Sequence, residues 1–172
     1  MTDAAPPPGS TTTPSEPTTA VPDSPAAITQ PVVRGFLVAD HATLPPDGKI
    51  YIAGGFFTLL RFQSFPGILQ TLGIAAAIEI PFRDIMSDHT LAVSLLGPNE
   101  EELPLRVEAR FRTAPNFESQ FGEPHLVPLA ATVTNVEFQH PGRYQFVLTL
   151  DGTELARYAL RATQTATAVL QH

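Results

Sequence analysis

The densest group of polar side chains lies between residues 84 and 89, where Asp84, Asp88 and His89 follow one another closely. Asp84 and Asp88 are four residues apart, so one turn of helix would place both carboxylates on the same face. Two carboxylates can contribute to a calcium or magnesium site, but these cations usually bind about six or more oxygen atoms, which the neighbouring sequence does not supply. Asp84 and Asp88 are therefore weak metal candidates, and a capping or solvated loop is the expected structure.

A second group is basic. Arg106, Arg110 and Arg112 alternate with apolar residues, which places the three guanidinium groups on one face of an extended strand, with Glu108 among them. Such a cluster can bind a carboxylate, a phosphate or an acidic partner, and the alternative is a face that only confers solubility. The same face carries no aromatic side chain on which a nucleobase would stack.

Composition excludes several other chemistries. The chain has no cysteine, which removes thiol nucleophiles, disulfides and thiolate metal sites. It lacks the glycine-rich loops that bind phosphates or dinucleotides and the G-x-S-x-G turn of serine hydrolases. No two of its five histidines have the i, i+2 or i, i+4 spacing of a preformed metal site. We therefore expect no cofactor, no metal and no catalytic residue.

The charge balance bears on the class of partner. Ten basic residues stand against seventeen acidic ones, for a formal net charge of -7. A chain without an excess of positive charge is poorly suited to neutralise a phosphate backbone. We expect no nucleic-acid partner.

The stretch from residue 50 to residue 82 is unusually apolar and contains only two charged residues. Its uncharged run is interrupted by polar residues, glycine and proline and is too short to span a membrane as a helix. Exposed aromatic residues beside glycine and proline often mark a contact surface, while ordinary core is the alternative. The predicted contact residues are Phe56, Phe57, Phe62, Phe65 and Leu69.

The elements that must position these side chains are strands. Alternation is strictest in residues 105–112, where every second side chain is apolar and the others are charged. Asp47-Gly48 and Asp151-Gly152 each separate two such runs and suit tight hairpin turns. Many short strands and no long amphipathic helix predict an all-β fold, an antiparallel β-sandwich of about eight strands. The best helical candidate is the short segment 82–88, and residues 113–128 are expected to form a long loop.

Composition also divides the chain. Residues 1–31 are rich in proline, threonine and alanine and lack any basic or aromatic residue, which predicts a disordered tail. Residues 32–164 form the predicted sandwich domain, and residues 165–172 a C-terminal extension. The first thirty residues have neither the basic start nor the apolar run of a secretory signal, so the expected location is the cytoplasm.

Two segments resemble a family of small, uncharacterised bacterial proteins. These are FLVADHA at residues 36–42 followed by DGKIYIAGGF at residues 47–56, and PGRYQF at residues 141–146 leading to LDG at residues 150–152. The resemblance covers roughly residues 33 to 162 and implies a β-sandwich of immunoglobulin-like or C2-like appearance. It implies no activity and no site residues.

Three classes of function remain open. The first is a non-catalytic interaction module that acts through a protein partner or through self-association. The second is a carrier of a small apolar ligand or lipid, held between the sheets. The third is an enzyme of unfamiliar type centred on Asp84, Asp88 and His89.

Overall fold

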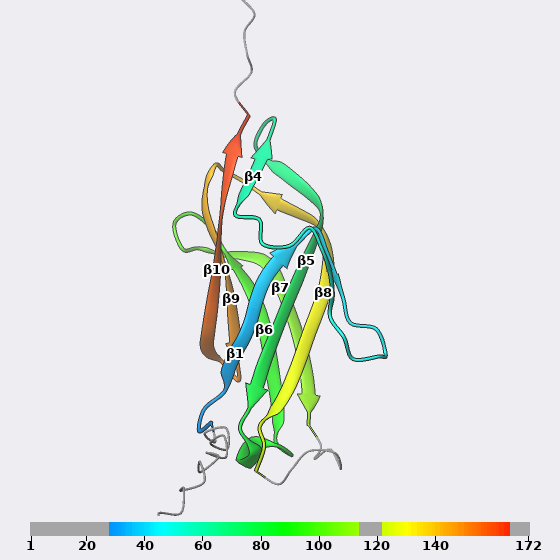
Figure 1. Ribbon diagram of the computed structural model, residues 1–172. Coiled ribbons are helices and arrows are strands. Elements are labelled where there is room, and N and C mark those ends of the chain that lie inside the picture. Colours follow the sequence, from blue (N-terminus) through cyan, green and yellow to red (C-terminus); the bar gives the residue numbers. More distant parts are fainter. Residues whose placement is uncertain (1–27, 114–121, 166–172) are drawn as a thin grey trace, which may run out of the picture.

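Two β-sheets stacked face to face form the main body of the described part of the chain (Figure 1). The structure is a computed structural model that describes residues 28–113 and 122–165. One sheet has three antiparallel strands in the order β1-β5-β8. Their bounds are Val32–Ala39 for β1, Gly67–Ile80 for β5 and His125–Phe138 for β8.

The second sheet has five strands in the order β4-β10-β9-β6-β7. Their bounds are Leu59–Phe62 for β4, Thr153–Gln164 for β10, Gly142–Leu150 for β9, Asp88–Leu96 for β6 and Glu102–Arg112 for β7. The short strand β4 lies parallel to β10, and the other neighbours are antiparallel. An all-β sandwich is therefore confirmed: within the described residues its two sheets hold eight strands, about the number predicted, with one parallel pair.

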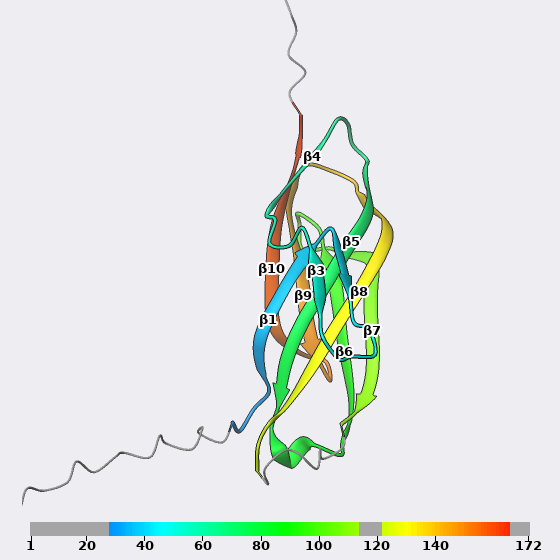
Figure 2. The ribbon, with the colours of Figure 1, turned by 45° about the vertical axis from the view of Figure 1, so that its right-hand side comes forward.

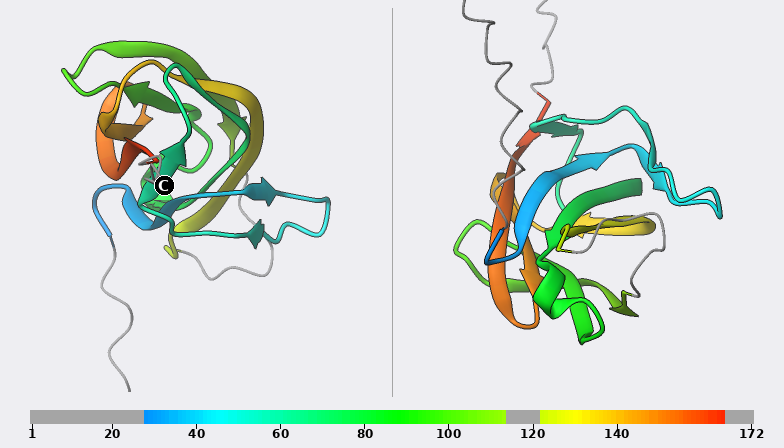
Figure 3. Two further views of the ribbon diagram at one scale, coloured as in Figure 1. Left: turned by 90° about the horizontal axis from the view of Figure 1, so that it is seen from above. Right: turned by 60° about the horizontal axis from the view of Figure 1, so that its bottom comes forward.

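The remaining two strands form a hairpin outside the sandwich. Strands β2 (His41–Thr43) and β3 (Tyr51–Ala53) pair with each other, and β2 crosses β5 and β8 on the outer face of the three-stranded sheet. Seen from above, the loop that joins β2 to β3 projects beyond the edge of that sheet (Figure 3). Figure 2 shows β3 in front of the sheet.

The core between the sheets follows from the alternation of side chains. Val38 and Ile74 from the three-stranded sheet and Phe146 and Leu148 from the five-stranded sheet are fully buried in one cluster. Burial of each such side chain contributes about 1.5–3 kcal/mol. A smaller cluster around Leu37 lies on the opposite face of β1, under the hairpin. The three-stranded sheet is thus covered on both faces.

Several local predictions need correction. Part of the apolar stretch at residues 50–82 is one long strand, β5, at residues 67–80. The segment 82–88 contains a single 3-10 turn, Phe82–Asp84, and Asp88 already belongs to β6. The loop expected at 113–128 ends earlier, because β8 begins at His125. Strand pairing across the sheet outweighs local turn signals in each case.

The two Asp-Gly turns differ. Asp151 and Gly152 form a two-residue turn between β9 and β10, and both have positive φ, as a type I′ turn requires. Asp47 and Gly48 lie in the seven-residue loop 44–50, where the Asp47 carboxylate accepts hydrogen bonds from the backbone N–H of Lys49 and the Tyr51 hydroxyl. Both hairpins are confirmed, but the first has a longer loop than predicted.

In the described part of the chain, no helix has both the length and the apolar character needed to cross a membrane. The predicted tail and C-terminal extension lie almost entirely outside the described residues.

Candidate functional site

The five apolar residues predicted for contact separate into two environments. Phe57, Phe62, Phe65 and Leu69 are partly buried and pack against the core cluster. The Phe62 ring lies 5.5 Å from the Phe65 ring, between centroids. Only Phe56 is exposed, at 71%. The predicted contact surface therefore narrows to Phe56.

Three other apolar residues between β2 and Phe56 are also exposed. Leu44, Tyr51 and Ile52 belong to the β2-β3 hairpin and its loop, and each is more than a third exposed. We call these three residues and Phe56 the hairpin surface. Tyr51, Ile52 and Phe56 belong to the apolar stretch at residues 50–82. The alternation of side chains along a strand does not show whether that strand lies in the sandwich or outside it, so the sequence does not separate these residues from the core.

The hairpin is held to the sheet by close contacts. The Thr132 hydroxyl accepts a hydrogen bond from the Ala42 backbone N–H at 3.0 Å and donates one to the Ala42 carbonyl at 2.8 Å. The same oxygen lies 3.0 Å from His41 Nδ1, which must then be the donor, since the hydroxyl has a single hydrogen. A Cβ at Gly73 would lie 2.5 Å from the Ala42 nitrogen, so only glycine lets β2 approach β5 this closely.

Phe56 has an unusual backbone conformation. Its φ is 66°, in the left-handed region that residues with a Cβ rarely adopt. Its N–H donates to the Val38 carbonyl at 3.0 Å, which fixes the chain where it returns to β1. The preceding Gly54 also has positive φ, and a Cβ there would collide with the Asp40 carboxylate. The backbone therefore holds the Phe56 ring out toward solvent.

A second surface lies on the opposite side of the sandwich. Alternation places seven of the nine arginines on the outer face of the five-stranded sheet. We call this surface the arginine face. Its arginines are Arg61 on β4, Arg157 and Arg161 on β10, Arg143 on β9, and Arg106, Arg110 and Arg112 on β7.

The three predicted arginines share a face of β7, as expected, but each has a partner within the chain. Glu108 accepts hydrogen bonds from both Arg106 and Arg110, at 3.3 and 3.2 Å. Arg112 donates to the Met86 carbonyl at 2.7 Å and lies 3.4 Å from the Asp88 carboxylate. Their role in partner binding remains a prediction.

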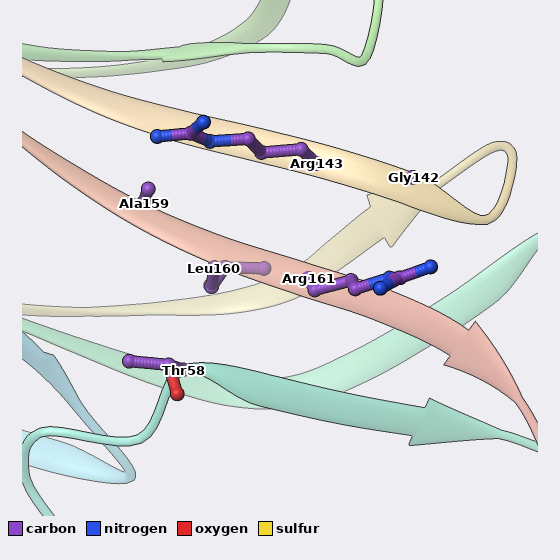
Figure 4. Close-up of a pocket in the computed structure, with 6 residues that line it drawn as sticks. All are labelled: Thr58, Gly142, Arg143, Ala159, Leu160 and Arg161. Atoms are coloured by element: carbon purple, nitrogen blue, oxygen red, sulfur yellow. The ribbon is translucent and has the colours of Figure 1, made fainter.

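On strands β4, β10 and β9 of the arginine face, some arginines have an ion-pair partner and others have none. Arg157 forms two hydrogen bonds with Glu154, at 2.7 and 2.9 Å. Within residues 28–113 and 122–165, the guanidinium groups of Arg61, Arg143 and Arg161 have no ion pair or hydrogen-bond partner. Arg143 and Arg161 are direct cross-strand neighbours and line an open pocket of about 420 Å³ (Figure 4).

Asp84, Asp88 and His89 are not arranged as the sequence suggested. Asp84 ends the 3-10 turn and pairs with Arg83, whereas the Asp88 carboxylate lies near Arg112. The two carboxylates do not share a helical face, because the helix is a single turn. In the part of the chain that the structure describes, no group of three or more metal-binding side chains is gathered.

His89 has an unexpected partner. Its Nδ1 lies 2.7 Å from Asp151 Oδ2, and its Nε2 lies 3.1 Å from the Asp84 carbonyl. Burial lowers the pKa of His89, but the bonds to Asp151 and to the Asp84 carbonyl outweigh it and hold the pKa above its ordinary value. Both ring nitrogens are engaged, so this pair acts as a structural clamp.

The comparisons with known proteins identify a family. The sequence model described as "Family of unknown function (DUF6941)" matches residues 34–163. The chain belongs to this family. The predicted resemblance to an uncharacterised family is thereby confirmed. The search of curated proteins found no match.

Solved structures are similar to part of the chain, and one of them is a DNA glycosylase. It is the Pseudomonas fluorescens alkylpurine DNA glycosylase AlkC bound to DNA containing an abasic site analog, with 8% sequence identity and a TM-score of 0.41. The match covers 77% of this chain but only 30% of the glycosylase chain. A likeness of this size carries no argument about function.

Proposed function

We propose that this chain is a non-catalytic binding module whose hairpin surface contacts a protein partner. The observation that carries the proposal is Phe56, which is both 71% exposed and in a left-handed backbone conformation. Neither feature helps the domain to fold.

Each feature lowers stability. A left-handed conformation costs about 1–2 kcal/mol for a residue with a Cβ, and an exposed phenylalanine forgoes about 1.5–3 kcal/mol of burial. Strained residues that persist in a fold often belong to sites of recognition. A partner that buries the ring would recover the second contribution.

A protein partner fits this surface better than a small ligand. Small molecules are usually held in concave pockets, whereas the hairpin loop projects from the sheet (Figure 3). The alternative of an apolar carrier has less support, because the space between the sheets is occupied by the buried core cluster.

The test uses Phe56→Asn in the full chain, because asparagine tolerates positive φ and removes the ring. A photo-crosslinking residue replaces Ile52 of the hairpin surface, and the protein is irradiated in its own host cells. We expect one dominant crosslinked protein, either a different chain or a second copy. The Phe56→Asn change should lower the crosslinking yield at least several-fold and leave the thermal stability of the domain unchanged or higher.

The matched control carries the photo-crosslinking residue at Ile68, which is 54% exposed on β5 and outside the hairpin. It should not capture the same protein. The proposal is overturned if Ile52 captures nothing beyond the Ile68 control, or if Phe56→Asn leaves the yield unchanged. A fall in thermal stability with Phe56→Asn would instead assign the ring a structural role and would also contradict it.

A further inference from the structure

We infer that Arg143 and Arg161, with Arg61 beside them, form a binding site for an acidic segment of a partner protein. The site lies at the β4-β10-β9 end of the arginine face. Leu44, Tyr51 and Ile52 of the hairpin surface lie in the β2-β3 hairpin on the other sheet, whereas Phe56 lies in the connection from β3 to β4.

The first argument is electrostatic. Arg143 and Arg161 are paired in register on adjacent antiparallel strands, and like charges directly opposite each other destabilise a sheet. Arg61 is paired with Thr163, two residues beyond Arg161, and adds a third positive charge. Elsewhere on this face each arginine has a carboxylate partner from the chain itself. An external anion would supply the missing one.

The second argument is the direction of the side chains. In Figure 4 the side chains of Arg143 and Arg161 extend in opposite directions along their strands. Their guanidinium groups do not converge on one point, as the capture of a single phosphate would favour. Two separate guanidinium forks suit two carboxylates, each bound in bidentate fashion. Acidic side chains spaced along an extended peptide have this arrangement.

The third argument favours a protein over a nucleic acid as the partner that binds this site. Strands β4, β10, β9, β6 and β7 place no aromatic side chain on the arginine face, so bases have no surface on which to stack. The formal net charge of -7 also opposes a long phosphate backbone. A short acidic segment is affected less, because charges beyond about 8 Å are screened at physiological salt.

The experiment measures binding of a fluorescein-labelled peptide of glutamates to the full chain by fluorescence anisotropy. The double variant Arg143→Gln/Arg161→Gln should weaken binding by at least about tenfold, since two charge-assisted contacts are lost. Its thermal stability should be unchanged or higher, because repulsion between like charges is removed. Raising the salt concentration should weaken binding to the unaltered chain.

The control Arg106→Gln/Arg110→Gln removes the same charge from the same face, but from arginines that already bind Glu108. We expect less than about a threefold effect on peptide binding. Equal effects of the two double variants would show nonspecific attraction and overturn the inference. A lower stability of Arg143→Gln/Arg161→Gln would also overturn it.

Two further probes make the assignment specific. A single-stranded oligonucleotide of matched length should bind more weakly than the peptide, and equal or tighter binding would overturn the choice of a protein partner. Phe56→Asn should leave peptide binding unchanged, so that failure of this inference is distinguishable from failure of the hairpin proposal.

Discussion

The side chain of His89 connects three parts of the chain through its contacts with Asp151 and with the Asp84 carbonyl. Asp151 sits in the β9-β10 turn, His89 on β6, and the Asp84 carbonyl in the 3-10 turn. Burial raises the pKa of Asp151, but the Thr90 backbone N–H and His89 outweigh this effect and hold the pKa below its ordinary value. The charged pair is therefore favoured in the folded state.

The direction of these shifts sets a pH dependence. His89 has a raised pKa, so its contribution is complete below its unfolded pKa and is lost as pH rises through the folded value. Asp151 has a lowered pKa, so its contribution is present above its unfolded pKa and is lost as pH falls through the folded value. The clamp should stabilise the fold most between pH 3.8 and pH 6.5, the ordinary pKa values of an aspartate and a histidine side chain.

We predict that Asp151→Asn lowers the melting temperature more at about pH 5.5 than at about pH 8. Asparagine tolerates the positive φ of the turn and can still accept the Thr90 N–H, so the change isolates the charge. Thermal unfolding across this range provides the measurement. A destabilisation that is the same at both pH values would contradict the assignment of a charged pair.

At the scale of elements, the attachment of the hairpin depends on a close approach of backbones. A Cβ at Gly73 would lie 2.5 Å from both the Ala42 nitrogen and the His41 carbonyl carbon, and backbone atoms cannot move aside as a flexible side chain can. The hairpin thus packs closely against β5 because residue 73 is glycine, and it is hydrogen-bonded to β8 through the Thr132 hydroxyl.

We predict that Gly73→Ala displaces the β2-β3 hairpin while the sandwich stays folded. Amide hydrogen exchange should become faster in residues 40–53 and change little in β9 and β6. Gly35→Ala is the control, because a Cβ at Gly35 meets no atom within 4 Å. Unchanged exchange in the hairpin of Gly73→Ala would show that the two backbones are farther apart than described.

At the scale of the whole molecule, aromatic contacts join the two sheets. Phe138 on β8 is fully buried, with ring centroids 4.8 Å from Tyr144 on β9 and 5.5 Å from Phe62 on β4. The Tyr144 hydroxyl also donates to the His140 carbonyl at 2.7 Å. Unfolding of one sheet must expose the other.

We predict that Phe138→Ala lowers the free energy of unfolding by about 3–5 kcal/mol, through lost burial and the cavity left behind. Denaturant unfolding followed by two probes should remain a single transition. Leu126→Ala on the same strand is the control, because that side chain is 52% exposed, and it should change stability by less than about 1 kcal/mol. A comparable effect of the two substitutions would contradict the described core.

The distribution of charge is also a property of the whole molecule. The sequence carries more acidic than basic residues, yet the fold gathers seven arginines on one face. The net charge of the chain gives no information about how the arginines are distributed over its surface. Only Arg106, Arg110 and Arg112 could be assigned together in advance, because they lie on one strand.

The sequence by itself determined that the fold is built of strands, and it also determined the Asp151-Gly152 turn and the apolar side of β7. Side-chain alternation has a period of two and turn chemistry involves adjacent residues, so both are legible locally. Tertiary structure alone decided which strands are neighbours and in what register. It brought Arg143 opposite Arg161, joined His89 to Asp151 across 62 residues, and placed Phe56 outside the core while Phe57 packs against it. These relations depend on contacts between segments that are far apart in the sequence. The free energy of such contacts cannot be inferred from the pattern of neighbouring residues.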